Sequence, residues 1–405
     1  MILQISHEVT YSDFEVVEKK CVGHPDTLAD GLAEHLSRKY SIYTRDKYGA
    51  ILHHNFDKVG LLGGASYVRF GEGRLTSPIR VLLNGRASTR FGNSLIPVND
   101  LLTIWSKEFL GERLPLLDVD KDLSFHYNLS NQSSPGKTEE NYKTEGTRKY
   151  WFEPRGLFDL QEFHNLLSND TSLGVGYAPF STLENIINII AEHLTSESFK
   201  RDNPWIGSDI KIMGYRNHGT INITLCVPQI SRFVFSAQMY KDNIQKTHEV
   251  IRSIIERNDI KEYEININTR DDFEKAELYL TAIGTSLESG DEGLVGRGNR
   301  INGLITPMRP MSMEGAAGKN PVYHIGKVYH VTANLIAKRI YEDLGVGNEV
   351  FLISQSGRDL FDPWVVHVNV KKKVDKKKIQ AIVNAYLGNI SIITLGILNN
   401  QYTIY

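Results

Sequence analysis

The chain has 405 residues, of which 41% are hydrophobic and 23% are charged, and its formal net charge is −2 at pH 7. This composition is typical of a soluble globular protein with one large unit or two to three smaller ones. The near-neutral charge argues against general nucleic-acid binding, which leaves a strongly basic footprint. The only cysteines, Cys21 and Cys226, are too few for a disulfide framework or a cysteine-based zinc site, so we expect a reducing compartment, the cytoplasm. No apolar run reaches the ~20 residues that span a membrane, and no signal-peptide pattern begins the chain.

The first motif is a predicted helix start at residues 23–31, which read GHPDTLADG. Pro25 fits the first helical position, with His24 at the cap and Asp26 in the first turn. Asp26 and Asp30 are four residues apart and would share one face, where they repel each other unless a cation is near. They are either a capping and a solvent-facing carboxylate or divalent-metal ligands, with Asp26 the better candidate. His24 is either structural or a donor to a phosphate.

Residues 121–160 differ in character from the segments around them. They include the polar, turn-rich run Asn131-Gln132-Ser133-Ser134-Pro135. Such composition predicts a mobile surface loop, which is either a disordered insertion or a lid over a site.

Two further carboxylates stand beside predicted strands. Asp170 precedes the run Gly174 to Tyr177, where we expect a buried carboxylate at a strand edge. Asp209 and Lys211 alternate along residues 207–214, so we expect both on one face of a strand, as a salt bridge or as part of a nucleotide pocket. The alternation of helical and strand segments along the chain indicates the α/β class.

Residues 284–327 are rich in glycine and carry five cations, Arg297, Arg300, Arg309, Lys319 and Lys327. Glycine allows close approach of a ligand to the backbone, and Arg and Lys bind phosphate oxygens. The stretch therefore predicts a polyphosphate site, and the alternative is a solvated basic loop. It is not a P-loop, because Asn320 stands where Ser or Thr should bind magnesium.

Two later segments carry predictions that a structure can test. Asn320 and Pro321 predict a helix start, with Gly345 as its end, which would place Lys319 and Lys327 near a phosphate-binding helix N-terminus. The lysine run at 371–378 predicts a solvated face, and a membrane or nucleic-acid patch is the lesser alternative. Residues 391–397 predict a strand.

Together these motifs resemble the S-adenosylmethionine synthetase (methionine adenosyltransferase) family, in its archaeal-type branch. The longest matching stretch is GDEGLVGRGNRINGLITP at residues 290–307, which continues into RPMSME at 309–314 and GKNP at 318–321. Shorter matches are Gly23 to Asp26 with Asp30, Asp170 with Gly174 to Ala178, and Asp209 to Lys211. The resemblance covers most of the chain and is weakest at residues 121–160.

The resemblance implies a transferase that makes S-adenosylmethionine from ATP and L-methionine. The methionine sulfur attacks C5′ of ATP and displaces triphosphate, which is then hydrolysed to diphosphate and phosphate. A neutral thioether needs no general base, so catalysis should come from alignment and from stabilising charge on the leaving group. The alternatives are a catalytically silent nucleotide-binding homologue and a synthetase that uses a methionine analogue.

By the same resemblance, the catalytic group is His24, Arg297, Lys319 and Lys327, which contact the triphosphate. Asp26 would bind magnesium, and Asp170 and Asp291 would face methionine. The remaining ATP and triphosphate contacts would come from Arg300, Asp209, Lys211, Gln132 and Ser133. Mg²⁺ is the implied cofactor, and K⁺ is common in the family.

The implied fold is α/β of the α+β type, with three similar α/β subdomains interleaved in sequence about a pseudo-threefold axis. Residues 1–405 would form one such unit, with a mobile loop or insertion at 121–160. Two subunits would pair through their sheets as a homodimer with active sites at the interface. The expected partners are ATP and L-methionine, with no nucleic acid and no membrane.

Overall fold

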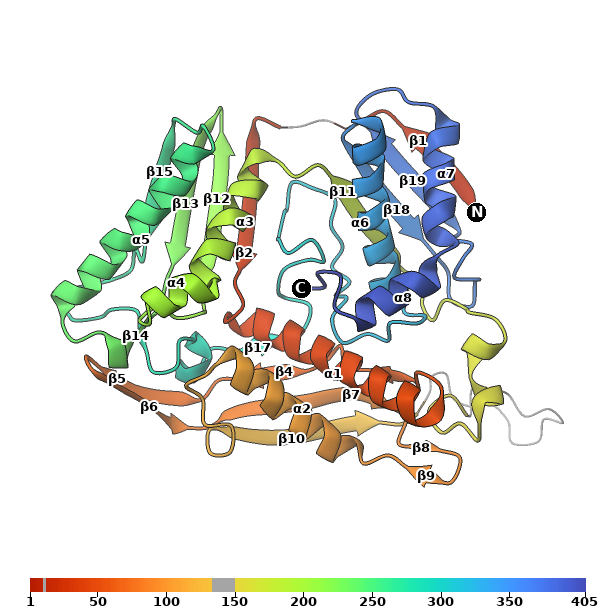
Figure 1. Ribbon diagram of the computed structural model, residues 1–405, viewed down its shortest axis with the longest axis horizontal. Coiled ribbons are helices and arrows are strands. Elements are labelled where there is room, and N and C mark those ends of the chain that lie inside the picture. Colours follow the sequence, from red (N-terminus) through yellow and green to blue (C-terminus); the bar gives the residue numbers. More distant parts are fainter. Residues whose placement is uncertain (10–11, 133–149) are drawn as a thin grey trace.

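Three mixed β-sheets surround the middle of the molecule in the computed structural model, which describes residues 1–9, 12–132 and 150–405 (Figure 1). Each sheet carries helices on one face. The C-terminus lies in the middle of the molecule, between the three sheets (Figure 1). We name the sheets after the helix that covers each of them: the α1, α3 and α6 sheets.

The α1 sheet has the strand order β10-β7-β4-β17, with β3 also paired to β7. Its strands are β3 (His54–Asn55), β4 (Gly60–Leu62), β7 (Ile79–Ala87), β10 (Leu123–Ser130) and β17 (Gly293–Leu294). Its helices are α1 (Pro25–Tyr48) and α2 (Val98–Arg113). Helix α1 packs through a fully buried row of leucines against the inner residues of β7.

The α3 sheet has the order β15-β13-β12-β2. Its strands are β2 (Phe14–Lys20), β12 (Lys211–Asn217), β13 (Thr220–Cys226) and β15 (Tyr263–Ile267). Its helices are α3 (Thr182–Thr195), α4 (Glu197–Asp202) and α5 (Ala237–Arg257). Ser181 caps α3 in a capping box with Glu184.

The α6 sheet has the order β1-β19-β18-β11 and joins the two ends of the chain. Its strands are β1 (Ile2–Ser6), β11 (Leu173–Ala178), β18 (Asn348–Ile353) and β19 (Val365–Val370). Its helices are α6 (Ile325–Leu344), α7 (Lys376–Leu387) and α8 (Ile390–Leu398).

Three two-stranded pairs complete the strands of the described chain. They are β5 (Ala65–Arg69) with β6 (Glu72–Ser77), β8 (Arg90–Phe91) with β9 (Ser94–Leu95), and β14 (Gln229–Ile230) with β16 (Leu280–Thr281).

All three sheets show the same order of pairings, a parallel pair followed by two antiparallel pairs. The parallel pairs are β10 with β7, β15 with β13, and β1 with β19. Each sheet also combines strands that are far apart in the sequence. The mixed α/β class that the sequence predicts is therefore confirmed.

Within the described part of the chain, helices cover one face of each sheet, and the second face carries half-buried and exposed apolar side chains. On the α3 sheet these include Phe14 and Tyr215, which are 44% and 42% exposed and whose rings lie 6.4 Å apart. On the α1 sheet Leu294 is 40% exposed. On the α6 sheet Phe351 lies beside His367. Apolar side chains at these positions are typical of a surface that another surface covers.

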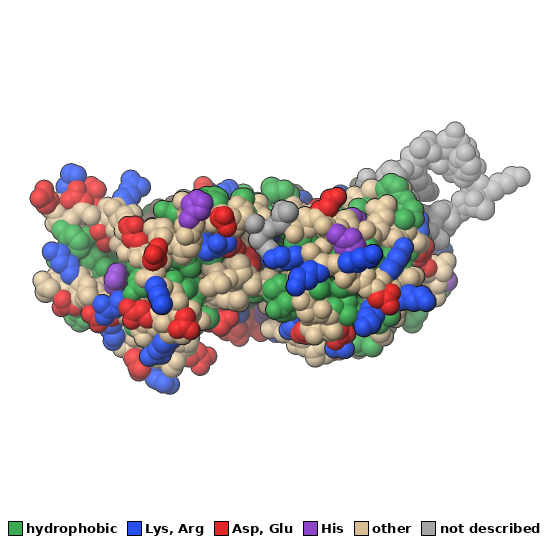
Figure 2. Space-filling view, turned by 90° about the horizontal axis from the view of Figure 1, so that it is seen from above, with side chains coloured by type: hydrophobic (Ala, Val, Ile, Leu, Met, Phe, Trp, Pro, Cys, Tyr) green, Lys and Arg blue, Asp and Glu red, His purple; other side chains and the backbone are tan. Residues whose placement is uncertain are grey.

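Residues 391–397 form helix α8, so the predicted strand there is wrong. A short apolar run does not separate the two states by periodicity alone, and here its buried residues pack against α6 and the C-terminal residues. Among the described residues no single helix is long and apolar enough to cross a membrane, although the bent pair α7 and α8 passes that test by length and composition. Lys and Arg side chains gather over the α6 and α7 half of the molecule (Figure 2), and the lysines at 371–378 are exposed there.

Candidate active site

Helix α1 begins where the sequence predicts, at Pro25, with His24 as its N-cap. The Nδ1 atom of His24 accepts the Asp26 N–H at 3.2 Å. Burial, and after it the nearby Lys20, lower the pKa of His24 to about 4, so the ring is neutral at pH 7. Because Nδ1 is the acceptor, the neutral ring carries its proton on Nε2 and presents a hydrogen-bond donor to a ligand.

The Asp26 carboxylate is buried and ion-paired. Its Oδ2 lies 2.9 Å from Lys20 Nζ, and its Oδ1 accepts the Leu294 N–H at 3.1 Å. The Nε atom of Arg297 is 4.0 Å from Oδ1, and the Arg297 side chain is 67% exposed. We call His24, Asp26, Lys20, Arg297 and Asp291 the α1 cluster. Lys20 is the cation that offsets the repulsion between the carboxylates of α1. Its position at the end of β2 gave no indication in the sequence that it would lie beside Asp26.

Asp209 and Lys211 do not lie on one face of a single strand, contrary to the prediction, because β12 begins only at Lys211. Asp209 turns to Ser286 and accepts its N–H at 2.8 Å and its hydroxyl at 2.5 Å. Burial raises the pKa of Asp209 to about 6. Lys211 instead pairs with Glu18 at 3.2 Å. The Ser286 Oγ atom also lies 3.1 Å from Asp291 Oδ2, and the Asp291 charge acts on His24, so Asp209 lies close to the α1 cluster.

Helix α6 begins at Ile325 with His324 as its N-cap, so the predicted start at Asn320 is wrong. The Asn320 side chain is used elsewhere, because its Oδ1 accepts the Val322 N–H and its Nδ2 donates to the Leu52 carbonyl. His324 repeats the geometry of His24, since its Nδ1 accepts the Gly326 N–H at 3.3 Å and burial lowers its pKa well below the usual value.

Both predicted phosphate-binding lysines near α6 are buried and paired with carboxylates. Lys319 Nζ lies 2.7 Å from Glu314 Oε1 and 3.1 Å from Asp57 Oδ2. Lys327 is fully buried, and its Nζ lies 2.6 Å from Glu34 Oε2. Burial lowers the pKa of Lys327, while Glu34 opposes that shift. Sequence reasoning did not identify Glu34, Asp57 or Glu314, because each approaches its lysine only through the fold.

Asp170 is exposed, and the expectation of a buried carboxylate is wrong. It meets Glu314 and His324, and one ligand-type atom from each of the three lies within 4.8 Å of the others. They line a cavity together with Asn84 and Arg86 of β7. With its proton on Nε2, His324 has no free nitrogen lone pair for a metal ion, so the trio is better suited to hydrogen bonding. We call Lys319, Lys327, Asp57, Glu314, His324 and Asp170 the α6 cluster.

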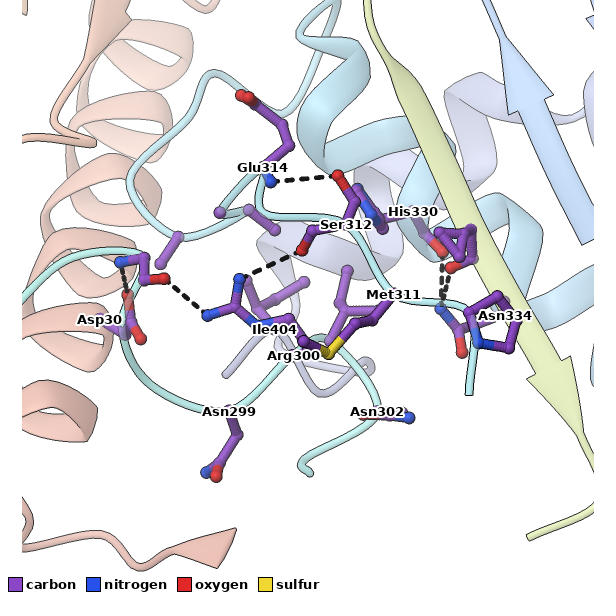
Figure 3. A pocket seen from close by; sticks show the side chains of 18 of the residues that line it. Asp30, Asn299, Arg300, Asn302, Met311, Ser312, Glu314, His330, Asn334 and Ile404 are labelled. Atoms are coloured by element: carbon purple, nitrogen blue, oxygen red, sulfur yellow. Dashed lines mark hydrogen bonds between the residues drawn. The ribbon is translucent and has the colours of Figure 1, made fainter. Parts of the chain in front are cut away.

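Arg300 makes its hydrogen bonds to the backbone of the Gly-rich segment (Figure 3). Its Nη2 donates to the carbonyls of Gly296 and Gly298 at 2.7 Å each, and its Nη1 donates to the Ser312 carbonyl at 3.3 Å. The guanidinium therefore supports the loop that carries Arg297. Gln132 is exposed just after the end of β10, and Ser133 lies outside the described residues.

The chain is similar along its whole length to known proteins. Residues 3–401 match the family described as S-adenosylmethionine synthetase (AdoMet synthetase). The S-adenosylmethionine synthase of Sulfurisphaera tokodaii is 38% identical over an alignment that covers 100% of this chain and 99% of that protein. The S-adenosylmethionine synthase of Methanocaldococcus jannaschii is 39% identical, with 96% and 95% covered.

A solved structure of an unusual S-adenosylmethionine synthetase from Campylobacter jejuni is similar in fold. Its TM-score is 0.56 at 15% identity, with 93% of this chain and 88% of that chain covered. At this identity the likeness concerns the fold alone.

Proposed function

Since the chain belongs to the S-adenosylmethionine synthetase family, we propose that it makes S-adenosylmethionine from ATP and L-methionine. The methionine sulfur forms a bond to C5′ of ATP while the bond from C5′ to the triphosphate oxygen breaks. Hydrolysis then divides the triphosphate into diphosphate and phosphate. The observation that supports this reaction most directly is the α1 N-terminus, where a neutral imidazole donor, a carboxylate and Arg297 lie together.

The chemistry requires charge stabilisation on the leaving group and no proton abstraction from sulfur. His24 Nε2–H would donate to the triphosphate oxygen at the breaking bond, and the positive end of the α1 dipole favours negative charge there. Arg297, Lys319 and Lys327 would hold the triphosphate, and Arg300 would assist by supporting the loop beneath Arg297.

Asp26 would hold a magnesium ion. Magnesium is bound through one or two carboxylates together with substrate phosphates, so a single buried carboxylate beside a triphosphate fits that ion. The ion pair of Asp26 with Lys20 at 2.9 Å supports this role, because the carboxylate already has a cation beside it. Mg²⁺ would neutralise phosphate charge. The potassium ion that the resemblance implies stays an expectation.

The other polar residues would serve the two substrates. Asp170 and Asp291 would face the ammonium group of methionine, and Asp209 and Lys211 would serve the nucleotide. Gln132 and Ser133 would contact ATP. The prediction of one mobile loop over residues 121–160 is wrong at its start, because Leu123–Ser130 form strand β10.

We further propose that the chain acts as a homodimer, with three subdomains about a pseudo-threefold axis in each subunit. The repeated pairing order of the three sheets supports the subdomains, and the apolar side chains on their uncovered faces support the pairing. Within one chain the two clusters are separated along α1, because Glu34, which pairs with Lys327, lies nine residues or about 14 Å from Pro25. A dimer would bring the α1 cluster of one subunit to the α6 cluster of its partner.

The test is to incubate the purified chain with ATP, Mg²⁺ and L-methionine and to measure S-adenosylmethionine, diphosphate and phosphate. We expect all three products, and we expect Arg297→Ala to lower their rate of formation. Nucleotide binding without product would favour the silent homologue. Product from a methionine analogue but not from methionine would favour the altered-specificity synthetase.

A further inference from the structure

One face of helix α1 carries three carboxylates, Asp26, Asp30 and Glu34, spaced four residues apart, which we call the acidic row. Residues at this spacing lie above one another on a helix. All three side chains are buried, and all three accept hydrogen bonds from backbone amides of residues 294–318. The acidic row therefore holds the Gly-rich segment by its main chain.

Asp30 contacts the backbone on both sides of Arg297. Its Oδ1 accepts the Gly296 N–H at 2.7 Å, and its Oδ2 accepts the Gly298 N–H at 3.1 Å. Arg297 is the residue between these two amides, so one carboxylate fixes the peptide units that carry this cation.

Glu34 has the same relation to Lys319. Its Oε2 accepts the Gly318 N–H at 3.1 Å, and one turn further along α1 the Ser37 hydroxyl donates to the Lys319 carbonyl at 3.0 Å. Lys319 is therefore held through the amide just before it and through its own carbonyl.

The glycines at the contact with α1 are required by the close approach of two backbones. A Cβ atom at Gly293 would lie 1.9 Å from the Pro25 carbonyl oxygen, and one at Gly298 would lie 2.2 Å from Asp30 Oδ2. These two positions accept no larger residue without movement. Part of the glycine content of the segment thus serves its contact with α1 and not a ligand.

Each carboxylate of the row also has a cation nearby, which offsets the repulsion between like charges on one helix face. Lys20 pairs with Asp26 and Lys327 pairs with Glu34, while Arg300 favours the charged form of Asp30. The row therefore keeps its acceptors at a fixed spacing along a rigid helix.

We propose that Asp30 and Glu34 are positioning residues, which fix the main chain on either side of Arg297 and just before Lys319. This inference rests on the proposed function, in which Arg297 and Lys319 bind triphosphate. Neither carboxylate touches the substrate. Asp30 acts through the backbone at Arg297, and Glu34 acts through the backbone at Lys319 and through its ion pair with Lys327. This role predicts that the effects of two substitutions on triphosphate binding are coupled in specific pairs, which a merely structural role does not predict. Asp30 should couple with Arg297, and Glu34 should couple with Lys319.

The experiment measures binding of inorganic tripolyphosphate with Mg²⁺ by calorimetry on the full chain. The variants are Asp30→Asn, Glu34→Gln, Arg297→Ala, Lys319→Ala and the four double variants that pair one acid with one cation. Asp159→Asn is the matched control, because Asp159 is also buried and accepts a backbone N–H, from Arg155, outside the Gly-rich segment. We expect Asp30→Asn and Glu34→Gln each to weaken binding about tenfold, the scale of losing a hydrogen bond to a charged group, and Asp159→Asn to leave it unchanged.

In the double-variant cycles, Asp30→Asn should have no further effect once Arg297 is Ala, but should keep its full effect when Lys319 is Ala. Glu34→Gln should keep its full effect when Arg297 is Ala and lose the larger part of it once Lys319 is Ala, with the remainder due to its ion pair with Lys327. Equal losses in both backgrounds would mean that the row only stabilises the fold, and unchanged binding in both acid variants would also overturn the inference. If Arg297→Ala and Lys319→Ala bind tripolyphosphate as the unaltered chain does, the proposed function itself fails.

Asp30→Asn and Glu34→Gln could unfold the chain, so thermal unfolding is measured for each. Asp30→Glu and Glu34→Asp keep the charge and shift the acceptor by one methylene. We expect these two variants to fold and to bind tripolyphosphate more weakly than the unaltered chain. Unaltered affinity in both would contradict a positioning role.

Discussion

A fully buried lysine keeps its charge only with a counter-ion, and Lys327 has one in Glu34 at 2.6 Å. Removing one partner of such a pair leaves an uncompensated buried charge, which costs about 3–5 kcal/mol. A loss of activity in Lys327→Ala alone would therefore mix a stability effect with a catalytic one.

We expect Lys327→Ala to lower kcat by at least ~100-fold, the scale for losing one charge that stabilises a transition state. The variants that separate the two effects are Glu34→Gln and Glu34→Gln with Lys327→Met, because the double variant leaves no unpaired charge. If Lys327 stabilises the triphosphate, kcat of the double variant falls ~100-fold below that of Glu34→Gln while the thermal midpoint recovers. Equal kcat in these two variants would show that Lys327 serves only as the partner of Glu34.

Six histidines have a pKa lowered mainly by burial, and they make stability depend on pH. The pKa is lowered to about 4 for His24, His35, His53 and His330, to about 3 for His54, and well below the usual value for His324. Between pH 6.5 and 4 the unfolded chain binds protons at these sites and the folded chain does not. Their contribution to stability is therefore present above pH 6.5 and is lost as the pH falls.

Six buried or partly buried acids act in the opposite direction, because burial also raises the pKa of Glu184, Asp271 and Glu288. Burial raises the pKa of Asp30 and Glu162 to about 7 and of Asp209 to about 6, so the folded chain takes up protons at these sites before the unfolded chain does. Because the histidines and the acids oppose each other, the test is made on a single histidine. The pKa of His35 is about 4 in the folded chain, so the unfolded chain binds up to one more proton there between pH 6.5 and 4.5, which is worth about 1.4 kcal/mol per pH unit. Relative to the unaltered chain, we expect the unfolding free energy of His35→Phe to increase by about this slope as the pH is lowered from 6.5 to 4.5. Parallel pH curves of the two chains would contradict this assignment.

At the scale of elements, the contact between β17 and the start of α1 sets the place of the α1 cluster. Gly293 pairs with Leu61 in the sheet and faces the Pro25 carbonyl on the other side. An added methyl group cannot fit between two backbones, neither of which is a flexible side chain.

We expect Gly293→Ala to displace the N-terminus of α1 and to lower both the thermal midpoint and the affinity for tripolyphosphate. The control is Gly111→Ala in α2, where the nearest atom to an added Cβ is a Val119 side-chain carbon at 3.2 Å, which can move. That control should be close to neutral in stability and in binding. Similar losses in both variants would mean that the contact with Pro25 has no special role.

The starts of α1 and α6 show when a local sequence signal is sufficient to predict where a helix begins. His24-Pro25-Asp26 predicted the start of α1 correctly, because the His24 ring remains free to accept the Asp26 N–H and cap the helix. Asn320-Pro321 carries an equally good signal, but the Asn320 amide donates to Leu52 from a distant segment, and the helix begins five residues later. A tertiary hydrogen bond decided the second case, and one sequence does not reveal it.

The same limit applies to the candidate site. The cations and carboxylates that motifs supply, such as Arg297, Lys319 and Asp26, were identified from the sequence. Their partners were not identified: Lys20 reaches Asp26 from the end of β2, and Asp57 reaches Lys319 across a sequence separation of 262 residues. The glycine content of this segment predicted a close approach of a ligand to the backbone. At Gly293 and Gly298 it is helix α1 that approaches closely, through the Pro25 carbonyl and the Asp30 carboxylate.

At the scale of the whole molecule, interleaving places the two clusters in different parts of one chain. Strand β1 pairs with β19, and their residues are more than 360 positions apart, so the ends of the chain close the α6 sheet. Helix α1 then spans the distance between the α1 and α6 clusters. The predicted interfacial site therefore needs a second chain to unite the two halves.

Subunit mixing tests that arrangement directly. His24→Ala disables the α1 cluster and Lys319→Ala disables the α6 cluster, and we expect either homodimer to be inactive. Two differently tagged chains, one with each substitution, are co-expressed and the mixed dimer is purified through both tags. If each site combines clusters from two chains, one site carries both substitutions and the other carries neither, so the mixed dimer should show about half of the unaltered activity.

If one chain supplied both clusters of a site, every site in the mixed dimer would carry one substitution and the dimer would stay inactive. Mass measurement in solution confirms that the purified species is a dimer. A control dimer that carries His24→Ala in both chains and Lys319→Ala in one has no intact site in either arrangement, and its activity sets the baseline. Activity at about half of the unaltered level, well above that baseline, requires the second chain to complete the site.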